Sequence, residues 1–152
     1  MQYYEDVVIG ATRETGRYTF SEDAIIRFAS QFDPQPFHID PEAAKHSNFG
    51  GLIASGWHTA ATVMRLIVDS AIDLEASLGS PGFDDLAWIK PVRPDDTIRA
   101  RLCCTEKTPS KSRPGIGSGR FLVEVFNQRD ELVMKFTSIG LMRFRDPQLQ
   151  QG

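Results

Sequence analysis

The segment from Asp33 to His38 (sequence DPQPFH) places a carboxylate and an imidazole five positions apart. An acid and a histidine held close together commonly act as a general acid–base pair, which transfers protons during a reaction. Pro34 and Pro36 fix their own φ angles and push the residues before them out of the α region. We therefore expect a stiff, partly extended loop, and not a helix, to bring Asp33 and His38 together. A purely structural role, with an acid that follows a helix and a histidine bonded to backbone in a tight turn, stays open.

The second candidate for chemistry is the start of a helix at Ser55 and Gly56. Ser55 is the expected N-cap, and the free N–H groups of the first turn, with the helix dipole, suit an oxyanion. The apolar residues that follow recur at helical spacing: Trp57, Ala60, Ala61, Met64, Ile67, Val68 and Ala71. Because Val63 and Leu66 widen this stripe, we expect the helix to be buried on most sides. An ordinary helix cap is the alternative interpretation of Ser55 and Gly56.

Other polar residues are weaker candidates. His58 falls on the less apolar side of the central helix, where it lines the pocket or the partner surface, or is a partly buried, hydrogen-bonded histidine. The spacing of His38, Asp40 and His46 matches no zinc pattern, so we expect no metal. A basic cluster of Lys107, Lys111 and Arg113 either holds a phosphate or belongs to a solvated loop. Cys103 and Cys104 are adjacent, so on a strand they point to opposite faces and stay reduced.

Length and composition describe one globular domain over residues 1–152, with a core of about residues 12–144. Of the 152 residues 41% are hydrophobic and 24% charged, which allows a sizeable core and argues against disorder. The net charge of -3 gives no reason to expect nucleic acid as a partner. No apolar run approaches the roughly 18 residues of a membrane span. Residues 1–6 lack the pattern of a signal peptide, so we expect a cytoplasmic protein without membrane contact.

The order of the expected elements indicates an α+β domain. A short strand over Arg17–Phe20 precedes a helix that Ser21 caps and the Asp33–Pro34 step ends. A short helix begins at Asp40-Pro41. After the central helix, strands are expected over Leu86–Ile89, Thr97–Lys107, Arg120–Asn127 and Leu132–Phe144, with residues 108–119 as a mobile loop and 128–131 as a hairpin. A strongly bent antiparallel sheet wrapped around one long helix satisfies this order.

The motifs together resemble the MaoC-like dehydratases, the (R)-specific enoyl-CoA hydratases of the hotdog fold. The resemblance covers about Thr12 to Phe144. It is carried by Asp-x-x-Pro-x-His-x-Asp-Pro from Asp33, by the Gly-Leu-Ile-Ala-Ser-Gly stretch that ends at Gly56, and by Trp-x-x-Pro-Val-x-Pro-x-Asp from Trp88. Thioesterases share the hotdog outline, so the motif around Asp33 and His38 is the more specific part.

The resemblance implies an activity and a site. An enoyl-CoA thioester binds with its carbonyl oxygen on the Gly56 amide, Asp33 helps deprotonate one water, and His38 holds that water and relays a proton. Substrate-binding positions would be Gln35, Ser55, Trp57 and Met64. No metal or separate cofactor is implied, because coenzyme A is part of the substrate, and the family pattern implies a homodimer.

Two positions differ from the family pattern. Family members usually carry Asn where this chain has Gln35, and many carry a Ser where it has Met64. We therefore expect a changed orientation of Asp33, the loss of a hydroxyl near it, and a more apolar pocket. Two other functions stay open: a hotdog acyl-CoA thioesterase, and a non-catalytic protein that binds acyl-CoA.

Overall fold

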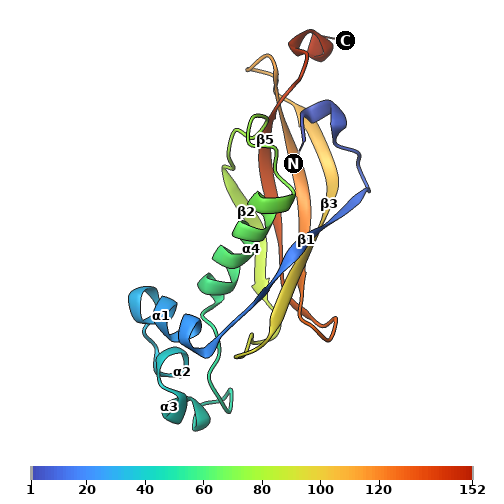
Figure 1. Cartoon of the computed structure of the whole chain (residues 1–152). Helices are drawn as coiled ribbons and strands as arrows, with labels where there is room; N and C mark the ends of the chain where they lie inside the picture. Colours follow the sequence, from blue (N-terminus) through green and yellow to red (C-terminus); the bar gives the residue numbers. More distant parts are fainter. Residues whose placement is uncertain (1, 152) are drawn as a thin grey trace.

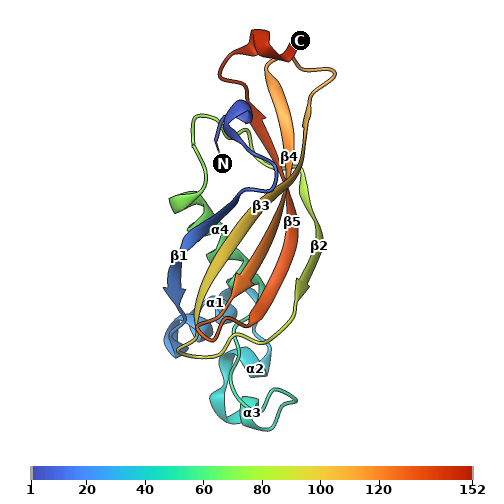
Figure 2. The same cartoon turned by 90° about the vertical axis from the view of Figure 1, so that its right-hand side faces the viewer.

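The computed structural model describes residues 2–151 of the chain. A five-stranded antiparallel sheet, with strand order β1-β3-β4-β5-β2, carries one long helix, α4, across one face (Figures 1 and 2). The strands are β1 (Thr12–Thr19), β2 (Gly82–Trp88), β3 (Thr97–Pro109), β4 (Ile116–Phe126) and β5 (Leu132–Arg143). The helices are α1 (Glu22–Phe32), α2 (Pro36–Ile39), α3 (Pro41–Lys45) and α4 (Gly56–Ser70), with short 3₁₀ helices at Tyr4–Asp6 and Pro147–Gln151. This arrangement confirms the predicted α+β class.

Caps and prolines set the ends of the helices near the site. The Ser21 hydroxyl accepts the N–H of Ala24 at 3.1 Å and begins α1. The helix ends at Phe32 because Asp33, which precedes a proline, takes a non-helical conformation with φ -153° and ψ 66°. Figure 1 shows α1, α2 and α3 gathered at one end of the sheet, while the C-terminus lies at the other end.

The bend after Asp33 is more ordered than the prolines suggested. The prediction of an extended loop holds for Gln35, with φ -74° and ψ 144°, but Pro36 begins the four-residue helix α2, which contains His38. Proline is tolerated at the first helical position, where its missing N–H would have no helical partner. The prediction that no part of this segment is helical was therefore wrong.

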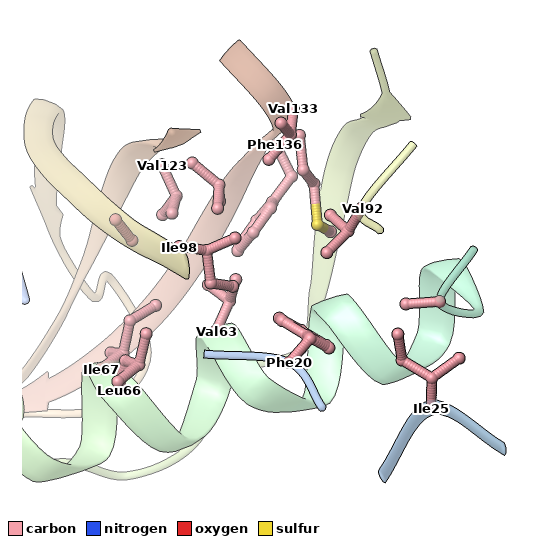
Figure 3. Close-up of a cluster of buried hydrophobic side chains, with 14 of the residues drawn as sticks. Phe20, Ile25, Val63, Leu66, Ile67, Val92, Ile98, Val123, Val133 and Phe136 are labelled. Atoms are coloured by element: carbon pink, nitrogen blue, oxygen red, sulfur yellow. The ribbon is translucent and has the colours of Figure 1, made fainter. Parts of the chain in front are cut away.

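The hydrophobic core lies between α4 and the sheet. Figure 3 shows Val63, Leu66 and Ile67 of α4 facing side chains of the sheet, and Phe20 and Ile25 extending the cluster toward α1. Each such side chain contributes about 1.5–3 kcal/mol when it is fully buried.

Only one face of α4 is buried, which corrects the prediction of a helix covered on most sides. The buried residues are His58, Thr59, Val63, Leu66 and Ile67. Four apolar residues of the predicted stripe, Trp57, Ala61, Met64 and Val68, are exposed and lie together on another face. Helical spacing alone therefore identified an apolar helix but not which of its faces meets the sheet.

Four of the five strands are longer than the sequence suggested, and β5 is one residue shorter. Strand β1 begins at Thr12, and Phe20 lies just beyond its end as a fully buried residue. Half of the expected mobile loop of residues 108–119 belongs to strands, because β3 extends to Pro109 and β4 begins at Ile116. Only residues 110–115 connect β3 and β4. The alternation of β3 places Cys104 in the interior and leaves Cys103 half-buried, both as free thiols, as predicted.

Lys107 does not belong to a solvated basic cluster. Its ammonium donates to the carbonyl oxygens of Tyr4 and Val7 at 2.9 and 2.8 Å and lies 4.5 Å from the centre of the Tyr4 ring. Lys107 therefore fixes the N-terminal segment onto the sheet. Across residues 2–151 no helix has the length and apolarity that crossing a membrane requires.

Candidate active site

Asp33 is held by hydrogen bonds to both carboxylate oxygens. The Gln35 amide donates to Oδ1 at 2.7 Å, and the Ser55 hydroxyl donates to Oδ2 at 2.7 Å. The Asp33 side chain is 19% exposed. These bonds join the end of α1, the start of α2 and the N-cap of α4, so the carboxylate sits where three helices meet. Its orientation is fixed on both sides.

His38 faces Asp33 with a defined nitrogen. Its Nε2 lies 3.3 Å from Asp33 Oδ2, and its Nδ1 lies 2.7 Å from the Ile53 carbonyl oxygen. Because a carbonyl oxygen only accepts, Nδ1 carries the hydrogen of that bond. In a neutral ring Nε2 is then an acceptor. The Ile53 carbonyl therefore presents the proton-accepting nitrogen of His38 to Asp33 and to the cavity.

The pKa of Asp33 is lowered. Partial burial raises it, but the hydrogen bonds from Gln35 and Ser55, together with the charge of His38, outweigh burial. Asp33 is therefore ionised at neutral pH. A carboxylate in this state accepts protons and hydrogen bonds, as a general base must.

Backbone bonds from two other segments position the start of α4. The N–H of Ile53 donates to the Phe37 carbonyl at 3.1 Å, and the N–H of Ala54 donates to the Val92 carbonyl at 2.8 Å. The Ser55 hydroxyl accepts the N–H of Trp57 at 3.3 Å, which confirms Ser55 as the N-cap. Within residues 2–151 the N–H of Gly56 has no hydrogen-bond partner. It remains available at the positive end of the helix dipole.

These residues line one cavity of about 410 Å³. Its walls include the polar groups of Asp33, His38 and Gly56. The aromatic residues Phe37, Phe49, Trp57 and Trp88 also line it. The surface is mostly apolar, with a few converging polar groups, which is the usual composition of a small-molecule site. Asp33, His38 and Gly56, chosen from the sequence, are thus brought together in one cavity.

The four predicted substrate-binding residues lie in different places. Trp57 lines the cavity and is 60% exposed. Gln35 and Ser55 contact Asp33 and are not part of the cavity wall. Met64 lies apart from this site and lines a second cavity of about 200 Å³, together with Ile67 and residues of the sheet.

The expected loss of a hydroxyl near Asp33 was wrong, since Ser55 supplies one. The sequence also gave no indication of the role of Trp88. The indole Nε1 of Trp88 donates to the Gly56 carbonyl at 2.9 Å, and its ring meets Trp57 edge-on at 5.2 Å. Both contacts span more than twenty residues, so no local pattern could reveal them. The family motif that begins at Trp88 marked the position but did not indicate what the side chain contacts.

His58 is buried and does not line the cavity. It is 7% exposed, and its ring stacks on Phe28 at 4.6 Å and meets Phe20 edge-on at 4.8 Å. Its Nδ1 is buried without a hydrogen-bond partner among the described residues, which contradicts the expected hydrogen-bonded histidine at that nitrogen. Burial, followed by the charge of Arg27, lowers the pKa of His58 to about 4. His58 is therefore a neutral side chain of α4 whose ring packs against α1.

Comparison with known proteins supports the resemblance read from the motifs. A profile of the MaoC like domain matches residues 6–120. The uncharacterized protein YdeM of Bacillus subtilis is 31% identical over 131 residues, which cover 86% of this chain and 92% of YdeM. A crystal structure of a MaoC-like dehydratase from Rhodospirillum rubrum is 40% identical and superposes with a TM-score of 0.90, covering 96% of this chain and 99% of that one.

The fold is also shared with more distant proteins. A Mycobacterium tuberculosis protein with a double hotdog fold superposes with a TM-score of 0.76 at 13% identity, covering 94% of this chain and 44% of that one. The profile match extends over most of the chain and includes Asp33, His38 and Gly56. The chain therefore belongs to the MaoC-like dehydratase domain family and has the hotdog fold.

Proposed function

We propose that the protein is a hydratase or dehydratase that adds water across the 2,3 double bond of an enoyl-CoA thioester, or removes it in the reverse direction. The observation that carries the proposal is the 3.3 Å approach of His38 Nε2 to Asp33 Oδ2 in the cavity that Gly56 also lines. Membership of the MaoC-like family and 40% identity to the dehydratase from Rhodospirillum rubrum support it.

Asp33 and His38 are suited to hold one water. When the His38 ring is neutral, with Nδ1 donating to Ile53, His38 and the ionised Asp33 present two acceptors to each other, and a water that donates one hydrogen to each satisfies both. As the water oxygen bonds to C3, Asp33 helps to deprotonate the water, and the proton that leaves it passes to Nε2 of His38, which relays that same proton to C2. The product is a 3-hydroxyacyl-CoA, and the same groups serve the reverse reaction.

Gly56 would stabilise the charge that this reaction creates. Attack at C3 moves the electrons of the double bond toward the thioester carbonyl oxygen, which becomes an enolate oxygen. The free N–H of Gly56 and the dipole of α4 favour that charge more strongly in the transition state than in the substrate. The proposal requires no metal and no separate cofactor, because coenzyme A is part of the substrate.

The two departures from the family pattern fit this chemistry. Gln35, the longer amide, reaches Asp33 Oδ1 at 2.7 Å, and Ser55 bonds the other oxygen. The carboxylate is thus held on both sides although position 64 is a methionine. This support for an oriented Asp33 favours an enzyme over a protein that only binds acyl-CoA.

A panel of enoyl-CoA thioesters tests the proposal. Crotonyl-CoA and longer or branched homologues should lose the ultraviolet absorbance of the conjugated thioester as 3-hydroxyacyl-CoA forms. Release of free thiol without hydration would favour the thioesterase. A raised melting temperature with acyl-CoA, without any turnover, would favour a non-catalytic binder.

Ser55→Ala is expected to move the acid limb of the kcat/KM profile to higher pH. The hydroxyl stabilises the ionised form of Asp33, so its loss raises the pKa of Asp33 and the base becomes protonated at a higher pH. The variant also loses a helix cap, which costs about 1 kcal/mol of stability. The measurements are pH–rate profiles and urea unfolding.

Ser21→Ala is the matched control for that change. Ser21 caps α1 in the same way, through the N–H of Ala24, but does not touch Asp33. It should lower stability by a similar amount and leave the acid limb in place. An unchanged acid limb in Ser55→Ala would contradict the assigned role of the Ser55 hydroxyl.

We also propose that the protein forms a homodimer through the exposed apolar face of α4. Trp57, Met64 and Val68 are 60%, 37% and 37% exposed, and with Ala61 they form one stripe along the helix. A second copy of the same stripe would cover it in a two-fold arrangement. Sedimentation should give a dimer for the wild type and a monomer for Val68→Glu, and a monomeric wild type at high concentration would contradict the proposal.

A further inference from the structure

Trp88 is carried to the helix start by an irregular edge strand. Within the described residues 2–151, strand β2 pairs only with β5, and its register shifts between Asp84 and Ala87. Asp85, inside this bulge, has φ 54°, the left-handed region that side chains seldom adopt. Bulges bend a strand and redirect the side chains that follow. Here the two strand residues that follow the bulge are Ala87 and Trp88, and Trp88 is the last of the strand.

The Trp88 indole lies against the first turn of α4. Its Nε1 donates to the Gly56 carbonyl at 2.9 Å, across 32 residues of sequence. A Cβ atom at position 56 would lie 2.4, 2.7 and 2.8 Å from three atoms of the indole ring, closer than real Cβ atoms come. All three of these nearest atoms belong to Trp88. The need for glycine at position 56 therefore comes from Trp88, not from backbone conformation.

The same indole is part of the cavity wall. Trp88 is 43% exposed, lines the cavity with Asp33 and His38, and meets Trp57 at an interplanar angle of 81°. One side chain thus bonds the Gly56 carbonyl, excludes any side chain from position 56 and forms part of the cavity wall. A fixed and partly desolvated N–H is what charge stabilisation at a carbonyl oxygen requires.

We propose that Trp88 is a positioning residue, which holds the first turn of α4 so that the Gly56 N–H meets the thioester carbonyl oxygen. This inference rests on the proposed hydratase or dehydratase function. Trp88 acts through Gly56 and needs no contact with the reacting atoms. Two consequences follow, one for stability that requires no substrate and one for catalysis.

The first test is a double-mutant cycle in urea unfolding. Gly56→Ala should lower the unfolding midpoint in the wild-type background, because the new methyl group meets the indole. In the Trp88→Ala background the same change should leave the midpoint unchanged or raise it, since alanine favours a helix more than glycine does. Additive effects in this cycle would overturn the proposal.

The second test separates kcat from KM. Trp88→Phe keeps an aromatic ring but removes the N–H that bonds Gly56. It should lower kcat roughly tenfold with little change in KM, because the lost contact acts in the transition state. Phe83→Leu is the control: Phe83 lies on the same strand, is 45% exposed and does not line the cavity. It should change neither kcat nor the Gly56→Ala effect.

The two tests distinguish failure of this inference from failure of the proposed function. If wild type is active and Trp88→Phe is equally active, Trp88 is not a positioning residue, and the function stands. If no enoyl-CoA is turned over, the proposed function fails and Trp88 positions no hydration step. The cycle then shows only whether the indole dictates glycine at position 56.

Discussion

His38→Asn is expected to reduce the rate of enoyl-CoA hydration by about 10²–10⁴, the usual contribution of a general acid or base. Asparagine can place an amide N–H close to where Nδ1 donates to the Ile53 carbonyl, but it has no counterpart of Nε2. The change therefore removes the group that faces Asp33 and keeps the contact that orders α2. Asp33→Asn should cause a loss of the same size, because the neutral amide cannot take a proton from water.

Controls test whether a lower rate comes from the loss of the acid–base pair and not from any histidine substitution or from misfolding. His46→Ala removes an exposed histidine eight residues away and should leave the rate unchanged. Circular dichroism and urea unfolding show whether each variant folds, which matters because His38 is only 5% exposed. Activity close to that of the wild type in either His38→Asn or Asp33→Asn would rule out the proposed acid–base pair.

His58 is expected to make the fold sensitive to acid. Burial and Arg27 lower its pKa to about 4 from an ordinary 6.5. As pH falls below 6.5, His58 becomes protonated in the unfolded chain but stays neutral in the folded protein until about pH 4. The free energy of unfolding therefore decreases across this window, by about 2–3 kcal/mol for a shift of this size. The stability is complete above pH 6.5 and is lost progressively toward pH 4.

His58→Phe isolates this effect. Phenylalanine keeps the stacking on Phe28 and the edge contact with Phe20, does not titrate, and removes a buried nitrogen without a partner. Urea unfolding at pH 7 and pH 4.5 should show a smaller loss of stability for the variant than for the wild type. Equal losses in the two proteins would show that His58 does not bind its proton differently in the folded and unfolded states.

Local signals predicted much of the fold. Ser21 and Ser55 cap the helices they were expected to cap, since capping depends only on the next few residues. The antiparallel strands after α4 and the hairpin at residues 128–131 also agree with the prediction, because they follow alternation and turn chemistry. The prolines were misjudged at Pro36, where position within the helix, not residue type, decides the outcome.

The site was predicted in its parts but not in its assembly. Asp33, His38 and Gly56 were chosen by residue type and family pattern, and they line one cavity. The contacts that hold them, Ser55 to Asp33 and Trp88 to Gly56, join residues 22 and 32 positions apart. The family pattern also placed Met64 at the site, but Met64 lines the second cavity, and the sequence alone does not tell which face of an apolar helix turns toward the site. Such contacts depend on tertiary packing.

The segment from the end of α1 to the first residue of α3 carries Pro34, Pro36 and Pro41 within eight residues. Proline restricts the unfolded chain more than the folded one, so less conformational entropy is lost when this segment becomes ordered. Asp33 and His38 are therefore preorganised: their relative placement is largely imposed by the chain before any ligand arrives. Binding energy from the substrate then need not be spent on arranging the acid–base pair.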